Sequence, residues 1–216
     1  MNRAAGGAGA RQGGKTRCIA PPNPHIWNIA TTIASAFSVM PRLFTALEIP
    51  AGIGKSLALL RGGLPGARWV EPENYPLSLR FIGDIDAALA REIADMLGQV
   101  KRPGFDLRID GLESFGGNRP RAVVAAVAAV PELIELQADH ERLMQRVGLE
   151  PERKYKPHVT LARLRDTSSR QLADYLSTRQ PFRSASFPVS RFVLYSSRAA
   201  VGGGPYVVEA EYPLAA

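Results

Sequence analysis

Apolar residues recur with two different spacings along the chain after residue 40. Runs with apolar side chains at every second position predict β-strands, and runs with apolar side chains three and four apart predict helices. The predicted strands cover residues 42–49, 67–71, 75–82, 104–115, 119–129, 157–164, 187–196 and 206–212. The predicted helices cover residues 51–62, 86–99 and 131–147, with a short one after Thr167-Ser168-Ser169 that ends near residue 177. This order of elements predicts an α+β fold with antiparallel sheets.

The sixth predicted strand carries the residues best suited to catalysis. Alternation places His158 and Thr160 on one face, with apolar residues between and after them. An imidazole beside a hydroxyl can move a proton while the hydroxyl holds an oxyanion, and the neighbouring Lys154, Lys156 and Arg163 would attract a phosphate. Alone, such a pair is more often an ordinary polar contact on a half-buried strand.

The third predicted strand shows a similar pattern, which favours a functional interpretation of His158 and Thr160 over an ordinary polar contact. Its polar face carries Pro76, Ser78 and Arg80, so that Ser78 corresponds to Thr160. Its other face, expected to lie in the core, carries Leu77, Leu79 and Phe81. Two such strands predict two similar lobes that face each other.

These two strands and their surroundings resemble the 2H phosphoesterases, most closely the RNA 2′,3′-cyclic phosphodiesterases, also called the 2′–5′ RNA ligase family. His158-Val159-Thr160-Leu161-Ala162-Arg163 matches the second His-x-Thr/Ser-x motif in full. Residues 41–50 resemble the family's first strand, and residues 69–84 resemble the run around its first motif. The resemblance covers about residues 40–214. The first motif departs from the pattern because it reads Pro76-Leu77-Ser78-Leu79, without its histidine.

The resemblance implies a fold, a reaction and a set of site residues. The fold would be two lobes of antiparallel sheet backed by helices, with the active-site cleft between them. The reaction would convert an RNA 2′,3′-cyclic phosphate end to a 2′-phosphomonoester without a metal or another cofactor. His158 would be the catalytic acid or base, and Ser78, Thr160 and Arg163 would bind the phosphate. Arg163 falls on the core side by strict alternation, so it reaches the cleft only if the strand ends or bulges after Leu161.

Pro76, at the vacated histidine position, cannot transfer a proton, so two interpretations stay open. The protein is either a slowed or altered phosphodiesterase or a binding protein for RNA ends or small cyclic nucleotides. Tyr75 is a poor substitute because alternation places it on the opposite face from Pro76. A purely structural role would leave the retained His158 and Thr160 unexplained. Phe44 is a candidate for stacking a base, although an aromatic residue on a first strand is more often core.

Charge and composition separate the first 39 residues from the rest. The net charge is +7, and residues 1–39 contribute +4 because they hold four basic residues and no acidic one. The mildly basic remainder suits a small anionic ligand or an RNA end better than a long nucleic-acid track. Residues 1–39 are rich in Gly and Ala and then in Pro, which predicts a disordered extension before a domain at 40–216. Met40 is then the expected native start.

A signal peptide with a cleavage site near Ala34-Ser35-Ala36 is the competing interpretation of this segment. Polar residues interrupt its apolar stretch, which argues against a signal peptide, so we expect a cytoplasmic protein. We also expect a monomer. No stretch of consecutive apolar residues reaches the length of about 18 that a membrane-spanning helix needs. The single cysteine, Cys18, excludes an internal disulfide and a cysteine-based zinc site.

Two further residue groups invite functional interpretations that the sequence does not support. Gly54-Lys55-Ser56 resembles the end of a P-loop, but the glycine required five places earlier is Ile49. His140 lies among charged residues of a predicted helix, which favours an exposed helical face rather than a site.

Overall fold

The computed structural model describes residues 42–152, 154–197 and 205–215, so the predictions for residues 1–39 and for Met40 fall outside it. Within these residues the chain forms ten strands and four α-helices. The strands are β1 (Arg42–Leu47), β2 (Ala67–Trp69), β3 (Leu77–Asp84), β4 (Phe105–Leu107), β5 (Ile109–Phe115), β6 (Ala122–Val127), β7 (His158–Leu164), β8 (Phe187–Val189), β9 (Arg191–Ser197) and β10 (Tyr206–Pro213). The helices are α2 (Ala51–Ala58), α3 (Ala87–Leu97), α4 (Pro131–Arg146) and α5 (Ser169–Ser177), with a 3₁₀ turn at Pro72–Asn74.

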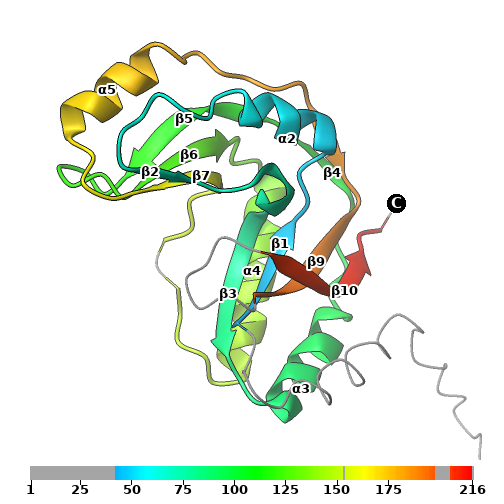
Figure 1. The fold of residues 1–216 in the computed structure, drawn as a ribbon. Coiled ribbons are helices and arrows are strands. Elements are labelled where there is room, and N and C mark those ends of the chain that lie inside the picture. Colours follow the sequence, from blue (N-terminus) through cyan, green and yellow to red (C-terminus); the bar gives the residue numbers. More distant parts are fainter. Residues whose placement is uncertain (1–41, 153, 198–204, 216) are drawn as a thin grey trace, which may run out of the picture.

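The main sheet consists of two antiparallel halves. One lobe contains β10, β9, β1 and β3 with α3 and α4, and the other contains β2, β7, β6 and β5 with α2 and α5 (Figure 1). β4 and β8 form a separate two-stranded ribbon. The predicted α+β fold with two lobes is therefore confirmed. Chain order does not follow the lobes, because β9 and β10 come from the end of the chain, and β9 pairs with β1 while β10 pairs with β9.

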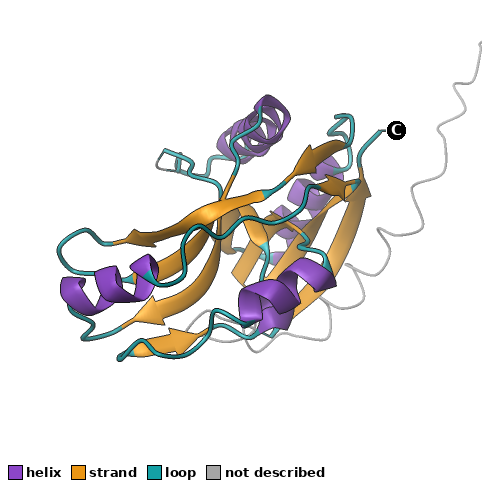
Figure 2. Cartoon of the chain, turned by 90° about the horizontal axis from the view of Figure 1, so that it is seen from above, coloured by secondary structure: helices purple, strands orange, loops and turns teal. Residues whose placement is uncertain are grey.

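A single residue pair joins the two halves. β3 and β7 run antiparallel and meet only at Leu77 and Val159, and both side chains are fully buried. Beyond this pair β7 continues along β2, and the strands of the two lobes diverge from the centre with helices on their outer sides (Figure 2). Leu77 and Val159 are the middle residues of the two motif triplets, so the motifs meet at the centre of the molecule.

Two predicted strands are each split in two. The single strand predicted at 104–115 forms β4, which pairs with β8, and β5, which pairs with β6. The strand predicted at 187–196 is divided in the same way into β8 and β9. Alternation continues through the first break, so only the choice of pairing partner separates β4 from β5. At the second break, Ser190 and Arg191 are both exposed and the alternation shifts by one residue before Phe192. Helix starts follow the sequence more closely: Ser168 caps α5 in a reciprocal capping box with Gln171.

A β-bulge in β3 makes part of the predicted alternation wrong. Thr45 pairs with Arg80 but Ala46 pairs with Ser78, which leaves Leu79 as an extra residue. After this bulge the faces exchange. Arg80, expected in the cleft, is only 4% exposed on the opposite side of the sheet, and Phe81, expected in the core, is 57% exposed.

His140 also departs from its prediction. It was expected on an exposed face of its helix, but it is fully buried in α4 beneath the sheet. Its ring packs edge-on against Phe192 of β9, with ring centroids 4.6 Å apart. The polar neighbours in sequence gave no sign of this, because the sheet covers the helix from one side only.

Among the described residues, no helix combines the length and apolar character that crossing a membrane requires.

Candidate active site

The four motif positions lie together at the centre of the sheet. Because Leu77 and Val159 are directly paired, antiparallel geometry places Ser78 beside His158 and Pro76 beside Thr160 on the opposite face. All four residues line one cleft of about 600 Å³. The structure therefore brings together the residues that the sequence analysis singled out.

The two motif hydroxyls are available for a ligand. Ser78 and Thr160 are half-buried, and neither hydroxyl makes a hydrogen bond to another described residue. A buried or half-buried hydroxyl usually has a partner, so an oxygen-rich ligand would complete their hydrogen bonding. Both can donate to the same ligand because they project from adjacent strands on one face.

Arg163 reaches this cleft through a second bulge. Val124 pairs with Thr160 but Val123 pairs with Ala162, which leaves Leu161 as the extra residue in β7. Of the two possibilities that the sequence left open, a strand end or a bulge, the structure has the bulge, and Arg163 lines the cleft with an exposed side chain. Arg68 of β2 lies directly across from Arg163, and neither forms an ion pair with another described residue. Two opposed cations destabilise each other unless an anion lies between or beside them.

His158 has a defined tautomer. Its Nδ1 lies 2.7 Å from the carbonyl oxygen of Lys156, and because a carbonyl only accepts, Nδ1 carries the proton and donates. Nε2 of the neutral ring is then an unprotonated acceptor. The ring packs edge-on against Phe115 with 4.7 Å between centroids, which fixes its plane. An imidazole in this arrangement can accept a proton at Nε2.

The surroundings of His158 keep it neutral at physiological pH. Burial lowers the pKa of His158 below its ordinary value, the hydrogen bond to the Lys156 carbonyl raises it, and the Lys156 ammonium lowers it again. The carboxylate of Glu113 raises the same pKa and forms an ion pair with Lys156. The net effect favours the unprotonated ring, which is the form that a general base needs.

The position opposite Thr160 offers no proton. Pro76 precedes the first residue of β3 and lines both the cleft and an adjoining pocket of about 410 Å³. Tyr75 lines the adjoining pocket, is 4% exposed, and has a pKa raised to about 12, chiefly by burial. Arg80 is held in ion pairs on the far side of the sheet. Neither neighbour therefore replaces the missing imidazole.

Comparison with known proteins identifies the family. The model of the LigT-like phosphoesterases matches residues 47–125 and again residues 124–206, which together cover well over half of the chain. The chain belongs to the LigT-like phosphoesterase family. The two successive matches agree with two related motifs, one in each half of the chain.

Named relatives and solved structures of LigT-like phosphoesterases extend this similarity. An RNA 2′,3′-cyclic phosphodiesterase of Escherichia coli K12 is 30% identical over 170 residues, which cover 76% of this chain and 92% of that protein. One of Methanothermobacter thermautotrophicus is 28% identical over 173 residues, covering 76% and 94%. The crystal structure of E. coli LigT complexed with 3′-AMP aligns with a TM-score of 0.66 and 27% identity, covering 82% of this chain and 99% of that one.

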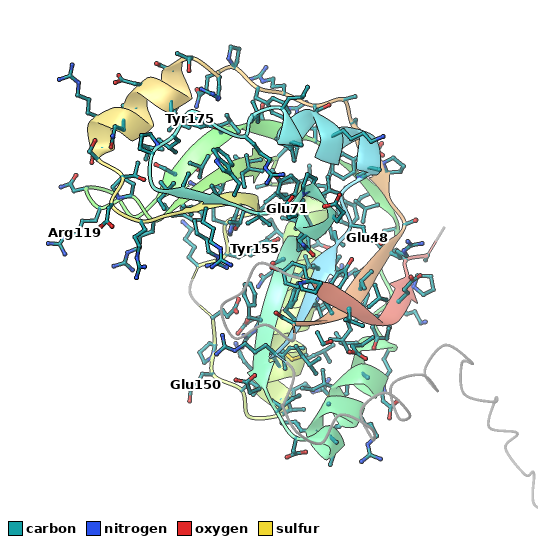
Figure 3. All side chains as sticks on the ribbon, in the orientation of Figure 1. Glu48, Glu71, Arg119, Glu150, Tyr155 and Tyr175 are labelled. Atoms are coloured by element: carbon teal, nitrogen blue, oxygen red, sulfur yellow. The ribbon has the colours of Figure 1, made fainter. Side chains whose placement is uncertain are left out.

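In this LigT-like phosphoesterase, contacts from α4 and from the loop between α4 and β7 hold β3 in place beside β7. Arg80 lies 2.8 Å from a carboxylate oxygen of Glu141 on α4 and 3.1 Å from one of Glu152, and its guanidinium donates to the carbonyl oxygen of Glu150. The hydroxyl of Tyr155 donates to the carbonyl oxygen of Ser78 over 3.2 Å. Figure 3 shows Tyr155 at the junction of the two lobes and Glu150 farther along the same loop.

One wall of the LigT-like cleft is aromatic, and sequence reasoning missed most of it. Phe44, the residue proposed to stack a base, is only 3% exposed and packs against Tyr195 and Tyr206 with ring centroids 5.4 and 4.9 Å apart. Phe81 lies on the rim beside it, 5.7 Å from Phe44 between centroids. No periodicity in the sequence could have revealed Phe81, because its position depends on the bulge.

Proposed function

We propose that this protein hydrolyses RNA 2′,3′-cyclic phosphate ends to 2′-phosphomonoesters through its own side chains, without a metal ion. The observation that supports this best is the convergence of two hydroxyls without a partner among the described residues, a cation and a neutral imidazole on one cleft. The relatives named RNA 2′,3′-cyclic phosphodiesterases give the substrate class. RNA ends and small nucleoside 2′,3′-cyclic phosphates share the reacting group, so both are expected ligands.

Phosphate binding is assigned to three side chains. The hydroxyls of Ser78 and Thr160 donate hydrogen bonds to the two non-bridging oxygens of the cyclic phosphate. Negative charge on these oxygens increases as a fifth oxygen approaches phosphorus, so donors aimed at them stabilise the transition state more than the ground state. The guanidinium of Arg163 neutralises part of that charge, and its nearness to Arg68 adds to the positive potential.

His158 is assigned the proton transfer that starts the reaction. Its Nε2 accepts a proton from a water molecule while the water oxygen forms a bond to phosphorus. The bond between phosphorus and the 3′-oxygen breaks, which leaves a phosphomonoester on the 2′-oxygen. The imidazolium formed is stabilised by the Lys156 carbonyl that accepts from Nδ1, and it returns its proton to solvent before the next cycle.

The 3′-oxygen that leaves also needs a proton, and Pro76 cannot supply one. In this chain that proton comes from water. Loss of one positioned acid or base typically lowers a rate by about 10²–10⁴-fold, so slow turnover is expected.

A second candidate function is favoured by Pro76 alone. A cleft with its phosphate-binding hydroxyls and Arg163 in place, but without the second proton-transfer group, is suited to retain a cyclic phosphate rather than convert it. The protein would then be a binding protein for RNA ends or cyclic nucleotides.

The deciding experiment measures product formation from a nucleoside 2′,3′-cyclic phosphate with a chelator present. Wild type is compared with His158→Ala, Pro76→His and the control Pro72→His, which adds an imidazole to the adjoining pocket instead of the cleft. The diagonal position of residue 76 relative to His158 would place a new imidazole on the other side of the bound phosphate. We expect wild-type turnover that depends on His158, a gain of about 10²–10⁴-fold in Pro76→His, and no gain in Pro72→His.

The outcomes separate the two functions. Turnover by the wild type that disappears in His158→Ala supports the phosphodiesterase. A silent wild type with an active Pro76→His variant supports the binding protein, because the cleft is then intact but lacks its acid. Turnover that needs added metal, or that survives His158→Ala, would refute the proposed mechanism.

A further inference from the structure

Two arginines lie side by side where the cleft continues along the second lobe. Arg68 of β2 is the direct partner of Arg163 of β7, and direct partners in an antiparallel pair carry their side chains on the same face. Both residues are exposed, and neither forms an ion pair with another described residue. Like charges placed directly opposite each other destabilise a sheet. The pair therefore costs stability unless an anion binds to it.

The same sheet pairs opposite charges in the other lobe. Arg42 of β1, which also lines the cleft, is the direct partner of Asp84 of β3, and its Nε lies 3.5 Å from a carboxylate oxygen of that residue. The cross-strand partner of Arg163 is a second cation instead of an acid. No aspartate or glutamate is among the described residues that line the cleft. The negative charge that suits the two arginines is therefore expected to come from a ligand.

The face of β2 that carries Arg68 is continuous with the cleft. Val70 lines the cleft together with the motif residues. Trp69 lies on the opposite face, where its ring centroid is 5.8 Å from that of Tyr175 on α5. Alternation along β2 therefore places Arg68 on the same face as Val70, and the pairing with Arg163 gives the same result.

We propose that Arg68 binds the internucleotide phosphate that precedes the terminal nucleotide of an RNA substrate. This inference rests on the proposed function, in which the terminal cyclic phosphate binds at the motif hydroxyls and Arg163. One ribose separates successive phosphates of a strand, so an RNA longer than one nucleotide has a second phosphate near the first. The guanidinium group suits this ligand because its planar donors match two phosphate oxygens.

The proposal gives the bound strand a direction and the protein a preference. The strand leaves the motif residues along β2 and β7, because the positive charge there has no carboxylate partner among the described residues, whereas Arg42 in the other lobe is paired with Asp84. The contact is to the backbone, so it does not depend on the base sequence. RNA ends of two or more nucleotides are then bound more tightly than mononucleotides.

The test changes a single charge on the ligand. Calorimetry measures the affinity of a diadenosine nucleotide with a 3′–5′ phosphodiester and a terminal 2′-phosphate, and of its counterpart with an uncharged methylphosphonate linkage. Both carry the product phosphate, so neither turns over. The variants are Arg68→Met, the charge-conserving Arg68→Lys, and the control Arg91→Met, which removes an exposed cation from α3 in the other lobe.

We expect the wild type to bind the phosphodiester about 10-fold more tightly than the methylphosphonate. Arg68→Met should bind the two ligands equally, Arg68→Lys should keep part of the preference, and Arg91→Met should keep all of it. Salt gives a second readout: the slope of log affinity for the phosphodiester against log salt concentration should be about 0.7 less steep in Arg68→Met, which is the effect of one phosphate contact on a single strand.

Adenosine 2′-monophosphate, which has no internucleotide phosphate, separates failure of this inference from failure of the proposed function. If the wild type binds it but does not distinguish the two dinucleotides, only the inference fails. A preference that survives in Arg68→Met would place the second phosphate elsewhere, and an equal loss in Arg68→Met and Arg91→Met would show a general effect of net charge; both overturn the inference. If adenosine 2′-monophosphate does not bind, the terminal phosphate site and the site at Arg68 fail together.

Discussion

Acid should destabilise this protein through one buried histidine. His140 in α4 is fully buried, its Nδ1 donates to the carbonyl oxygen of Leu136 over 2.8 Å, and its Nε2 has no partner among the described residues. Protonation would place a charge at Nε2 with no hydrogen-bond acceptor and with the ring of Phe192 against it. Burial accordingly lowers the pKa of His140 from its ordinary 6.5 to about 4, although the Leu136 carbonyl and the charge of Asp139 act in the opposite direction.

The sign and size of the effect follow from linkage. Because the pKa of His140 is lower in the folded state, the unfolded chain takes up the proton first as the pH falls. The stabilisation is fully present above pH 6.5 and is lost as the pH falls toward the folded pKa of about 4. The free energy of unfolding should therefore be about 2 kcal/mol lower at pH 5 than at pH 7.5, from this residue alone.

The assay is urea unfolding of wild type and His140→Leu at both pH values. Every other titrating group contributes equally to the two proteins, so the comparison isolates His140. We expect the wild type to lose about 2 kcal/mol more than the variant between pH 7.5 and pH 5. Leucine keeps the site apolar, so the variant should fold at neutral pH. An identical pH dependence in wild type and variant would show that His140 keeps its ordinary pKa in the folded protein, which would contradict its burial.

Two further predictions test the charges around the site. Removing the Lys156 ammonium in Lys156→Met should raise the pKa of His158, and removing the Glu113 carboxylate in Glu113→Gln should lower it, as followed by NMR titration of the imidazole; shifts in the same direction would contradict the assignment. Arg80→Met should lower the free energy of unfolding by about 3 kcal/mol because it leaves two partly buried carboxylates unpaired. The control Arg42→Met breaks an exposed ion pair and should lower it by about 1 kcal/mol or less, and equal effects in urea unfolding would contradict the structural argument.

Much of the site was predictable because β-strand alternation is a local property. His158 and Thr160 are two residues apart on one strand, so they share a face whatever that strand pairs with. The same holds for Pro76 and Ser78. The absence of a proton-transfer group at residue 76 is also plain from the sequence, since no tertiary arrangement can give a proline side chain a labile proton.

The remaining site residues depended on events between strands. A bulge exists only when one strand has an extra residue relative to its partner, so it cannot be seen in either strand alone. The bulge at Leu79 moved Phe81 into the cleft and Arg80 out of it, and the bulge at Leu161 brought Arg163 in. His140 was misassigned for a related reason: charged neighbours suggested solvent, but the sheet covers its helix.

The sequence by itself determined the elements, the two motif strands and the chemistry of their side chains, because these depend on residue type and on the two-residue period of a strand. Only the tertiary structure decided how those strands meet. The single pair between Leu77 and Val159 places both motifs on one cleft, and the equivalent bulges give that cleft a cation on one lobe and an aromatic ring on the other. Strand pairing and register are set by contacts between residues far apart in the chain, and such contacts leave no local pattern to read.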